Sequence, residues 1–158
     1  MDLESLHTTR RTLVSEEKFD LPTDRPLGLS WSAINGSPTR IAAATAELLK
    51  DRGPSIILAQ QPNHAWGIAK TLYDGQSTNE GISHDVKLVS DFLAEELGPD
   101  FPLVSYLSRG IGVHHAGISE DARILQEWLL EENKLDFLAA TTTIAQGVNF
   151  PVATVVLA

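Results

Sequence analysis

The sequence predicts an open α/β fold, in which a parallel sheet carries helices on its faces. Short apolar runs alternate with longer segments whose apolar residues recur at helical spacing. These runs lack the polar alternation of a half-exposed strand, as expected for strands buried on both faces. A chain of 158 residues is also long enough to bury about two-thirds of its unfolded surface as one domain.

Residues 1–37 stand apart from this pattern. They are rich in charges and in turn-forming residues, including Arg10-Arg11, Glu16-Glu17-Lys18, Pro22 and Pro26. We interpret them as a linker or an N-terminal arm, with one strand expected around residues 27–32. The folded domain is therefore expected to cover residues 38–158.

The first helix of the domain is predicted over residues 38–52. Ser37 and Pro38 are typical of a helix start, and Gly53 is typical of its end. The predicted buried face consists of Ile41, Ala44, Leu48 and Leu49. The short apolar run over residues 55–59 is the first predicted strand.

Three helical segments follow before the second strand. Pro62 opens a helix that ends at Gly75, with a buried side of Ala65, Ile68, Ala69 and Leu72. Ser83 caps a helix that ends at Gly98, with apolar residues Val86, Val89, Leu93 and Leu97. Pro102 opens a shorter helical turn.

The remainder of the chain is predicted to add three strands. Residues 111–115 form a strand, and a helix over residues 119–133 follows it, capped by a serine. The predicted buried stripe of this helix consists of Ala122, Leu125, Trp128 and Leu129. Residues 135–140 form the next strand, 142–146 a helical turn and 153–157 the last strand.

Composition limits the classes of function. Acidic residues outnumber basic ones by 21 to 12, so the net charge is −9 and the chain alone should bind a polyanion poorly. There is no cysteine, which excludes disulfides and Cys-ligated zinc. No apolar stretch approaches the roughly 20 residues of a membrane span, so we expect a cytoplasmic protein without a membrane partner.

The polar candidates for a site follow the predicted strands. In open parallel sheets, ligands bind where the strands end. Those ends are Gln60-Gln61, His114-His115-Ala116-Gly117 and Thr141-Thr142-Thr143, which should share one edge. The nearest cations are expected to be Arg109, Arg123 and Lys134.

Each of these turns also has an ordinary structural interpretation. His114 and His115 point to opposite faces of a strand, so they cannot chelate one metal, and no metal site is expected. They are either hydrogen-bonded structural residues or parts of a site in which Gly117 admits a ligand. Thr141 and Thr142 either cap a helical turn or bind a phosphate.

Other side chains are assigned to packing and to solvated surface. Trp66, Trp128 and Phe92 fit helix packing better than base stacking. The acidic residues of the 119–133 helix are predicted to be a solvated face. The chain has neither a phosphate-binding Gly-x-x-x-x-Gly-Lys loop nor an acidic pair for magnesium. No catalytic residue is therefore assigned.

Residues 112–119 and 137–151 together resemble one helicase family. Gly112-Val113-His114-His115-Ala116-Gly117-Ile118-Ser119 is similar to its motif IVa, and Phe137 to Pro151, with Thr141-Thr142-Thr143 and Gln146-Gly147-Val148-Asn149, to its motif V. Residues 55–61 are similar to motif IV. The chain thus resembles the second RecA-like domain of superfamily 2 DEAD/DEAH-box helicases, most closely the Ski-type and archaeal repair-helicase branch.

This resemblance implies half of an ATP-dependent motor. Its nucleic-acid track would include His114, His115, Gly117, Thr141 and Thr142, and its interdomain ATP cleft would include Gly147 and Asn149. The implied partners are a first RecA-like domain and DNA or RNA, with ATP and Mg²⁺ as cofactors of the full-length enzyme and none bound to this chain alone. The family's motif VI would follow the last strand, so the chain is expected to be a fragment that is inactive alone.

Two alternatives stay open at this point. One is a nucleotide-independent module with the same fold that binds protein through its acidic helices. The other is an unrelated small-ligand enzyme in which His114 or His115 acts as a base.

Overall fold

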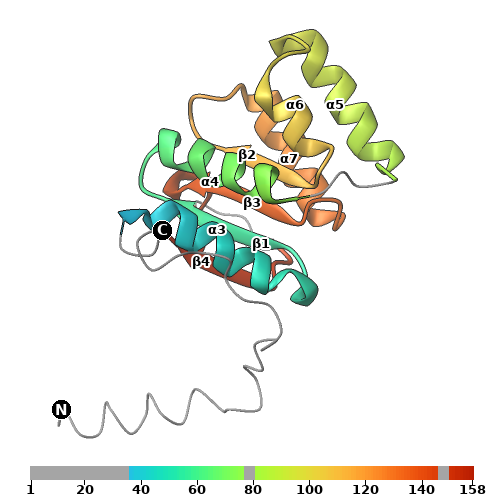
Figure 1. The fold of residues 1–158 in the computed structure, drawn as a ribbon. Helices are drawn as coiled ribbons and strands as arrows, with labels where there is room; N and C mark the ends of the chain where they lie inside the picture. Colours follow the sequence, from blue (N-terminus) through green and yellow to red (C-terminus); the bar gives the residue numbers. More distant parts are fainter. Residues whose placement is uncertain (1–35, 77–80, 146–149) are drawn as a thin grey trace, which may run out of the picture.

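The computed structural model describes residues 36–76, 81–145 and 150–158 (Figure 1). The strand expected around residues 27–32 lies outside them. The elements, in chain order, are α3 (Pro38–Leu48), η2 (Lys50–Arg52), β1 (Ser55–Ala59), α4 (Pro62–Gly75), α5 (His84–Leu97), α6 (Pro102–Leu107), β2 (Ile111–His114), α7 (Glu120–Glu131), β3 (Phe137–Thr141), η3 (Thr142–Ala145) and β4 (Thr154–Leu157).

The described strands form one parallel sheet, as predicted, in the order β2-β3-β1-β4. β1 lies between β3 and β4, with Ser55 beside Phe137 on one side and beside Thr154 on the other. β2 pairs with the outer side of β3, where Ile111 lies beside Phe137. Because every pair is parallel, all carboxyl ends lie at one edge of the sheet.

Helices cover the sheet on both sides, so the predicted layered α/β fold is confirmed. His115 contacts Trp66 of α4, whereas the preceding residue His114 contacts Glu127 of α7. Neighbouring residues of an extended chain point to opposite faces, so α4 and α7 pack on opposite faces. Figure 1 shows α3 beside α4 on the same face.

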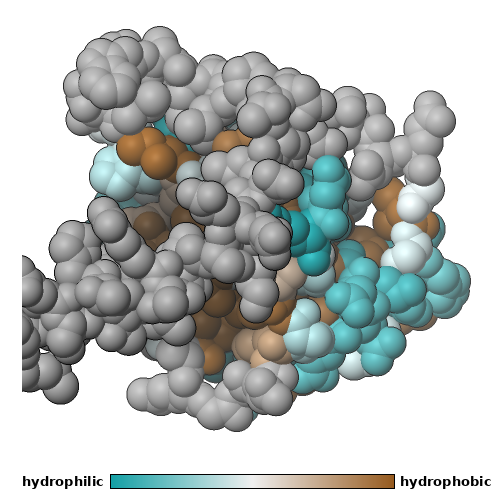
Figure 2. Space-filling model, turned by 90° about the horizontal axis from the view of Figure 1, so that it is seen from below, coloured by the Kyte–Doolittle hydropathy of each residue, from teal (hydrophilic) through white to brown (hydrophobic). Residues whose placement is uncertain are grey.

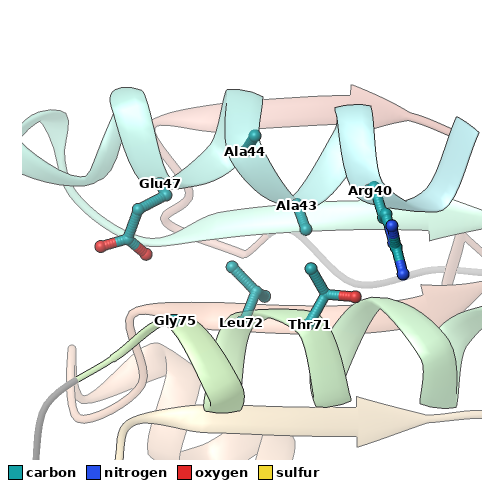
Figure 3. Close-up of a pocket in the computed structure, with 7 residues that line it drawn as sticks. All are labelled: Arg40, Ala43, Ala44, Glu47, Thr71, Leu72 and Gly75. Atoms are coloured by element: carbon teal, nitrogen blue, oxygen red, sulfur yellow. The ribbon is translucent and has the colours of Figure 1, made fainter. Parts of the chain in front are cut away.

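The buried face of α3 differs from the prediction. Its buried residues are Ala42, Ala43 and Ala46, whereas Ile41, Ala44, Leu48 and Leu49 are only partly buried. Three alanines let α3 lie close to its neighbours, so the small residues rather than the large ones face inwards. A groove of about 170 Å³ lies between α3 and α4, with Arg40 and Glu47 of α3 above Thr71 and Leu72 of α4 (Figure 3).

The helix boundaries follow the predicted signals closely. Pro62 and Pro102 open α4 and α6, and Ser83 and Ser119 cap α5 and α7 by accepting backbone N–H groups at 3.3 Å. All four residues predicted for the buried side of α4 are buried. Ser37 stands at the start of α3, but its hydroxyl makes no cap bond and instead contacts the Thr39 hydroxyl at 3.0 Å.

The prediction for α7 was wrong at its aromatic residue. Ala122 and Leu129 are buried, but Trp128 is 40% exposed, and Gln126 is buried in its place. Phe92 of α5, also assigned to packing, is 43% exposed. No further described element covers the outer sides of these two helices, so their apolar residues face solvent.

One part of the sheet face opposite α3 and α4 is also apolar. Val155 and Leu157 of β4 are 55% and 78% exposed, and by register they share a face with Ile56 and Leu58 of β1. Figure 2, seen from below, shows apolar surface in a hollow on this side of the molecule. Among the described helices, none is long and apolar enough to cross a membrane.

Candidate functional site

The three predicted turns do meet at one edge of the sheet. Ala59 at the end of β1 lies beside Thr141 at the end of β3, and His114 at the end of β2 lies beside Ala140. The residues that follow these strand ends are exposed, namely Gln60, Gln61, Ala116, Gly117 and Thr142. The edge therefore presents short polar or backbone groups from three strands to solvent.

His115 is a buried anchor of this edge. Its side chain is 7% exposed, and the Trp66 indole N–H points at Nε2 from 2.9 Å, with the rings edge to face. The Gly117 backbone N–H points at Nδ1 from 3.0 Å. A neutral imidazole has one accepting nitrogen, so it accepts one of these two bonds at a time, and a protonated ring accepts neither.

The electrostatic surroundings also favour the neutral ring of His115. Burial lowers its pKa, and the charges of His114 and Arg123 lower it further. A neutral ring that accepts from α4 or from its own turn is a positioning group. It holds the backbone of Ala116 and Gly117 in place at the surface.

His114 is still more buried and faces the opposite side. Its side chain is 2% exposed, and its Nε2 lies 2.7 Å from Glu127 Oε1 of α7. Its Nδ1 is buried and has no hydrogen-bond partner among the described residues. Glu127, predicted to be part of a solvated face, is thus a partner of the first histidine.

Two residues beneath the turn fix β2 against α7. The buried Gln126 amide accepts the Val113 backbone N–H at 2.7 Å and donates to the Ala122 carbonyl at 3.0 Å. A Cβ on Gly112 would lie 2.6 Å from Leu138 Cδ1, so any larger residue here would force the Leu138 side chain to move. The turn therefore stands on a tightly packed base.

The threonine turn divides into a buried and an exposed residue. Thr141 ends β3 and is 7% exposed, whereas Thr142 begins η3 and is exposed. Of the two, Thr142 is the one that can offer its hydroxyl at the surface. Gly147 and Asn149, assigned to an ATP cleft, lie outside the described residues.

Two of the three cations expected near the turns lie elsewhere. Arg109 precedes β2, donates to the Tyr73 and Gln76 carbonyls and stacks on the Tyr73 ring at 3.8 Å. Lys134 precedes β3 and lies 3.8 Å from Asp85. Both are therefore at the amino-end edge, because they come before strands rather than after them.

Arg123 is the remaining cation of the three. It lies on α7, its Nε is buried without a partner among the described residues, and its charge reaches His115. Within the described ranges, no group of three or more His, Cys, Asp or Glu side chains could hold a metal ion. The edge thus offers hydroxyl and backbone groups with one nearby guanidinium.

Sequence reasoning missed Trp66 and Gln126 as parts of this site, and it placed Glu127 in the resemblance to the helicase family without expecting its contact with His114. Trp66 is 49 residues away from His115 along the chain, so no local pattern joins them. Gln126 and Glu127 sit on a helix whose phase was judged from its apolar residues alone. A glutamine at an apolar position was the available signal, since a buried amide needs a partner.

The sequence of this chain is similar to sequences of known helicases. The chain is 30% identical over 113 residues to the ATP-dependent DNA helicase Hel308 of Thermoplasma acidophilum, an alignment that covers 70% of this chain and 15% of that protein. It is 44% identical over 55 residues to the DExH-box ATP-dependent RNA helicase DExH14 of Arabidopsis thaliana, covering 35% and 2% of the two chains.

A third relative extends the set. Activating signal cointegrator 1 complex subunit 3 of Dictyostelium discoideum is 47% identical over 51 residues, covering 32% of this chain and 2% of that protein. The chain is related to superfamily 2 helicases. No family model matches it.

The helicase relatives are much longer than this chain. The chain spans 2% to 15% of their length, so it corresponds to a small part of each. The similarity agrees with the layered α/β fold. It also supports a function related to nucleic-acid helicases in general.

Proposed function

We propose that this chain is part of the second RecA-like domain of an ATP-dependent helicase, of the Ski-type and archaeal repair-helicase branch. In this role, its sheet edge forms part of the nucleic-acid track. The observation that carries the proposal is the meeting of three strand-end turns at one edge, with the backbone of Gly117 and the residue Thr142 exposed there.

The chemistry of the edge supports a phosphate contact. Exposed hydroxyl and backbone N–H groups bind phosphate oxygens without reading sequence. The imidazoles of His114 and His115 are too buried to contact a nucleic-acid strand. We therefore assign them as positioning residues that hold the turn. Thr142 and the adjoining Thr141 would make or support the contacts, and Gly117, whose N–H points at His115, would let a nucleic-acid backbone approach closely.

The remaining parts of the motor would lie outside this chain. A first RecA-like domain would supply the phosphate-binding loop, and ATP with Mg²⁺ would bind between the two domains. Gly147 and Asn149 would face that cleft. With a net charge of −9, the chain would depend on its partner domain for most phosphate neutralisation.

The test is a polypeptide that carries this chain together with its first motor domain. Thr142→Ala is expected to lower nucleic-acid-stimulated ATPase activity, and Thr141→Ala is expected to do the same, while the basal rate and the melting curve stay unchanged. Thr71→Ala, which removes a hydroxyl in the groove between α3 and α4, is the control. Unchanged stimulation in both edge variants would refute the phosphate role.

The isolated chain provides a second test. We expect no ATP turnover from it, with or without DNA or RNA, because it lacks a phosphate-binding loop. Robust turnover would contradict the assignment to half of a motor.

A further inference from the structure

The outer sides of α5 and α7 form an apolar groove whose lining includes none of the residues of the three turns. Its lining residues are Leu88, Val89, Phe92, Asp121, Ile124 and Leu125, and its volume is about 320 Å³. Leu88, Phe92 and Ile124 are 59%, 43% and 53% exposed. Trp128 lies one turn beyond Ile124 on the same helix and is 40% exposed.

The spacing of these residues makes the groove continuous. Leu88 and Phe92 are four residues apart on α5, as are Ile124 and Trp128 on α7, so each pair lies on one helix face. A row of large apolar side chains from each helix lines the groove. Scattered surface leucines need no explanation, but a contiguous apolar area of this kind marks an interaction surface.

The charges around the groove select its occupant. α5 and α7 together carry eight Asp or Glu side chains, among them Asp121 in the groove itself, and two cations, Lys87 and Arg123. Lys87 is paired with Asp91 at 2.8 Å, and Arg123 is partly buried. Of the acids, Glu127 contacts His114 and Asp85 lies 3.8 Å from Lys134. The acids of the two helices that have no such partner are all exposed, namely Glu95, Glu96, Glu120, Asp121 and Glu131, so the surface of α5 and α7 around Asp121 is acidic.

We propose that this groove binds a basic amphipathic helix of a partner protein. Apolar residues of such a helix at positions i, i+3 or i+4, and i+7 would fill the groove. Its Lys and Arg side chains would face the acidic flanks and steer the encounter. A second copy of this chain is a poor occupant, because two acidic surfaces repel each other at short range.

The test uses a designed peptide and the intact chain. The probe is a fluorescently labelled peptide of about 18 residues, long enough to form a helix, with leucines at helical spacing and lysines elsewhere. Its scrambled version keeps the composition but loses the apolar face. Fluorescence anisotropy gives the affinity of each, and circular dichroism confirms that every variant is folded.

The proposal expects three results. Phe92→Ser and Ile124→Ser each lower the affinity for the designed peptide by about tenfold or more, because each removes an anchor residue. Ile82→Ser, which removes a 49% exposed isoleucine outside the groove, leaves the affinity unchanged. Asp121→Lys weakens binding, and added salt weakens it further.

Three results would overturn the proposal. The scrambled peptide could bind as well as the designed one, which would reduce the effect to net charge. The two serine variants could bind like the unaltered chain, which would place the contact elsewhere. Concentration-dependent dimerisation that Ile124→Ser abolishes would identify a second copy as the occupant.

Discussion

The sheet edge and the α5–α7 groove both depart from the usual arrangement of apolar side chains inside and polar ones outside. The edge buries polar side chains, whereas the groove exposes apolar ones. At the edge, two histidines are buried and glycine and threonine face solvent. In the groove, leucine, isoleucine, phenylalanine and tryptophan are exposed while acids surround them. Buried polar groups and exposed apolar patches are the two informative exceptions to the pattern of protein interiors.

The difference teaches what each region is built to present. At the edge, hydrogen bonds from α4 and α7 hold a turn in place. A fixed turn suits contacts that are made by the backbone and by small side chains. The groove presents large side chains directly, which suits a partner that buries them. We therefore expect mutations of the buried groups that support the edge to change stability, and mutations in the groove to change binding only.

The largest effect is expected from Gln126→Ala. It leaves the buried Val113 N–H without its partner and opens a cavity, so the free energy of unfolding should fall by about 3 kcal/mol. Ile124→Ala, two residues away on the exposed side of α7, should change it by no more than about 0.5 kcal/mol. Urea denaturation measures both, and equal losses would remove the contrast between the two regions.

The second effect compares two tryptophans. Trp66→Phe removes the N–H that points at His115 and should lower the free energy of unfolding by about 1 kcal/mol. Trp128→Phe makes the same chemical change on the groove side, where the side chain is 40% exposed, and should be nearly neutral. If Trp128→Phe were the more costly change, α7 would be packed differently from the structure.

The third and smallest effect concerns pH. The pKa of His115 is lowered by burial and by the charges of His114 and Arg123, from an ordinary value of 6.5. The unfolded chain therefore binds a proton before the folded chain does. The contribution of neutral His115 to folding stability is therefore complete above pH 6.5, and it is lost as the pH falls towards the lowered pKa of the folded state.

The measurement is the free energy of unfolding at a series of pH values between neutrality and mild acid. Replacement of His115 by phenylalanine should flatten the decline below pH 6.5, even if it lowers stability at every pH. A decline of the same slope in His115→Phe would show that another group carries the pH dependence.

Much of the fold could be predicted from local sequence. Ser83, Ser119, Pro62 and Pro102 mark helix starts by chemistry that acts within a few residues. The apolar runs give the strands, and their order in the chain, together with parallel pairing, puts the three turns at one edge. These are statements about neighbours in sequence, or about topology that follows from them.

The remainder depended on which surfaces meet in space. The helical phase of α7 groups Leu125 with Trp128, but it does not say whether another element covers that face, and none does among the described residues. The three alanines of α3 replaced the larger residues in the core because close packing favoured small ones. The bonds from His115 to Trp66 and from His114 to Glu127 join residues that local patterns treat as independent.

The most direct test of the account is a pair of separate NMR titrations of the ¹⁵N-labelled polypeptide that carries this chain together with its first motor domain, one with each of two ligands. Single-stranded nucleic acid at low salt is expected to shift the amides of Gly117 and Thr142, and the basic amphipathic peptide those of Phe92 and Ile124. In the separate titrations, neither ligand should shift the amides assigned to the other. If both ligands shifted the same residues, or the nucleic acid shifted only the groove, the division of the molecule into these two surfaces would be wrong.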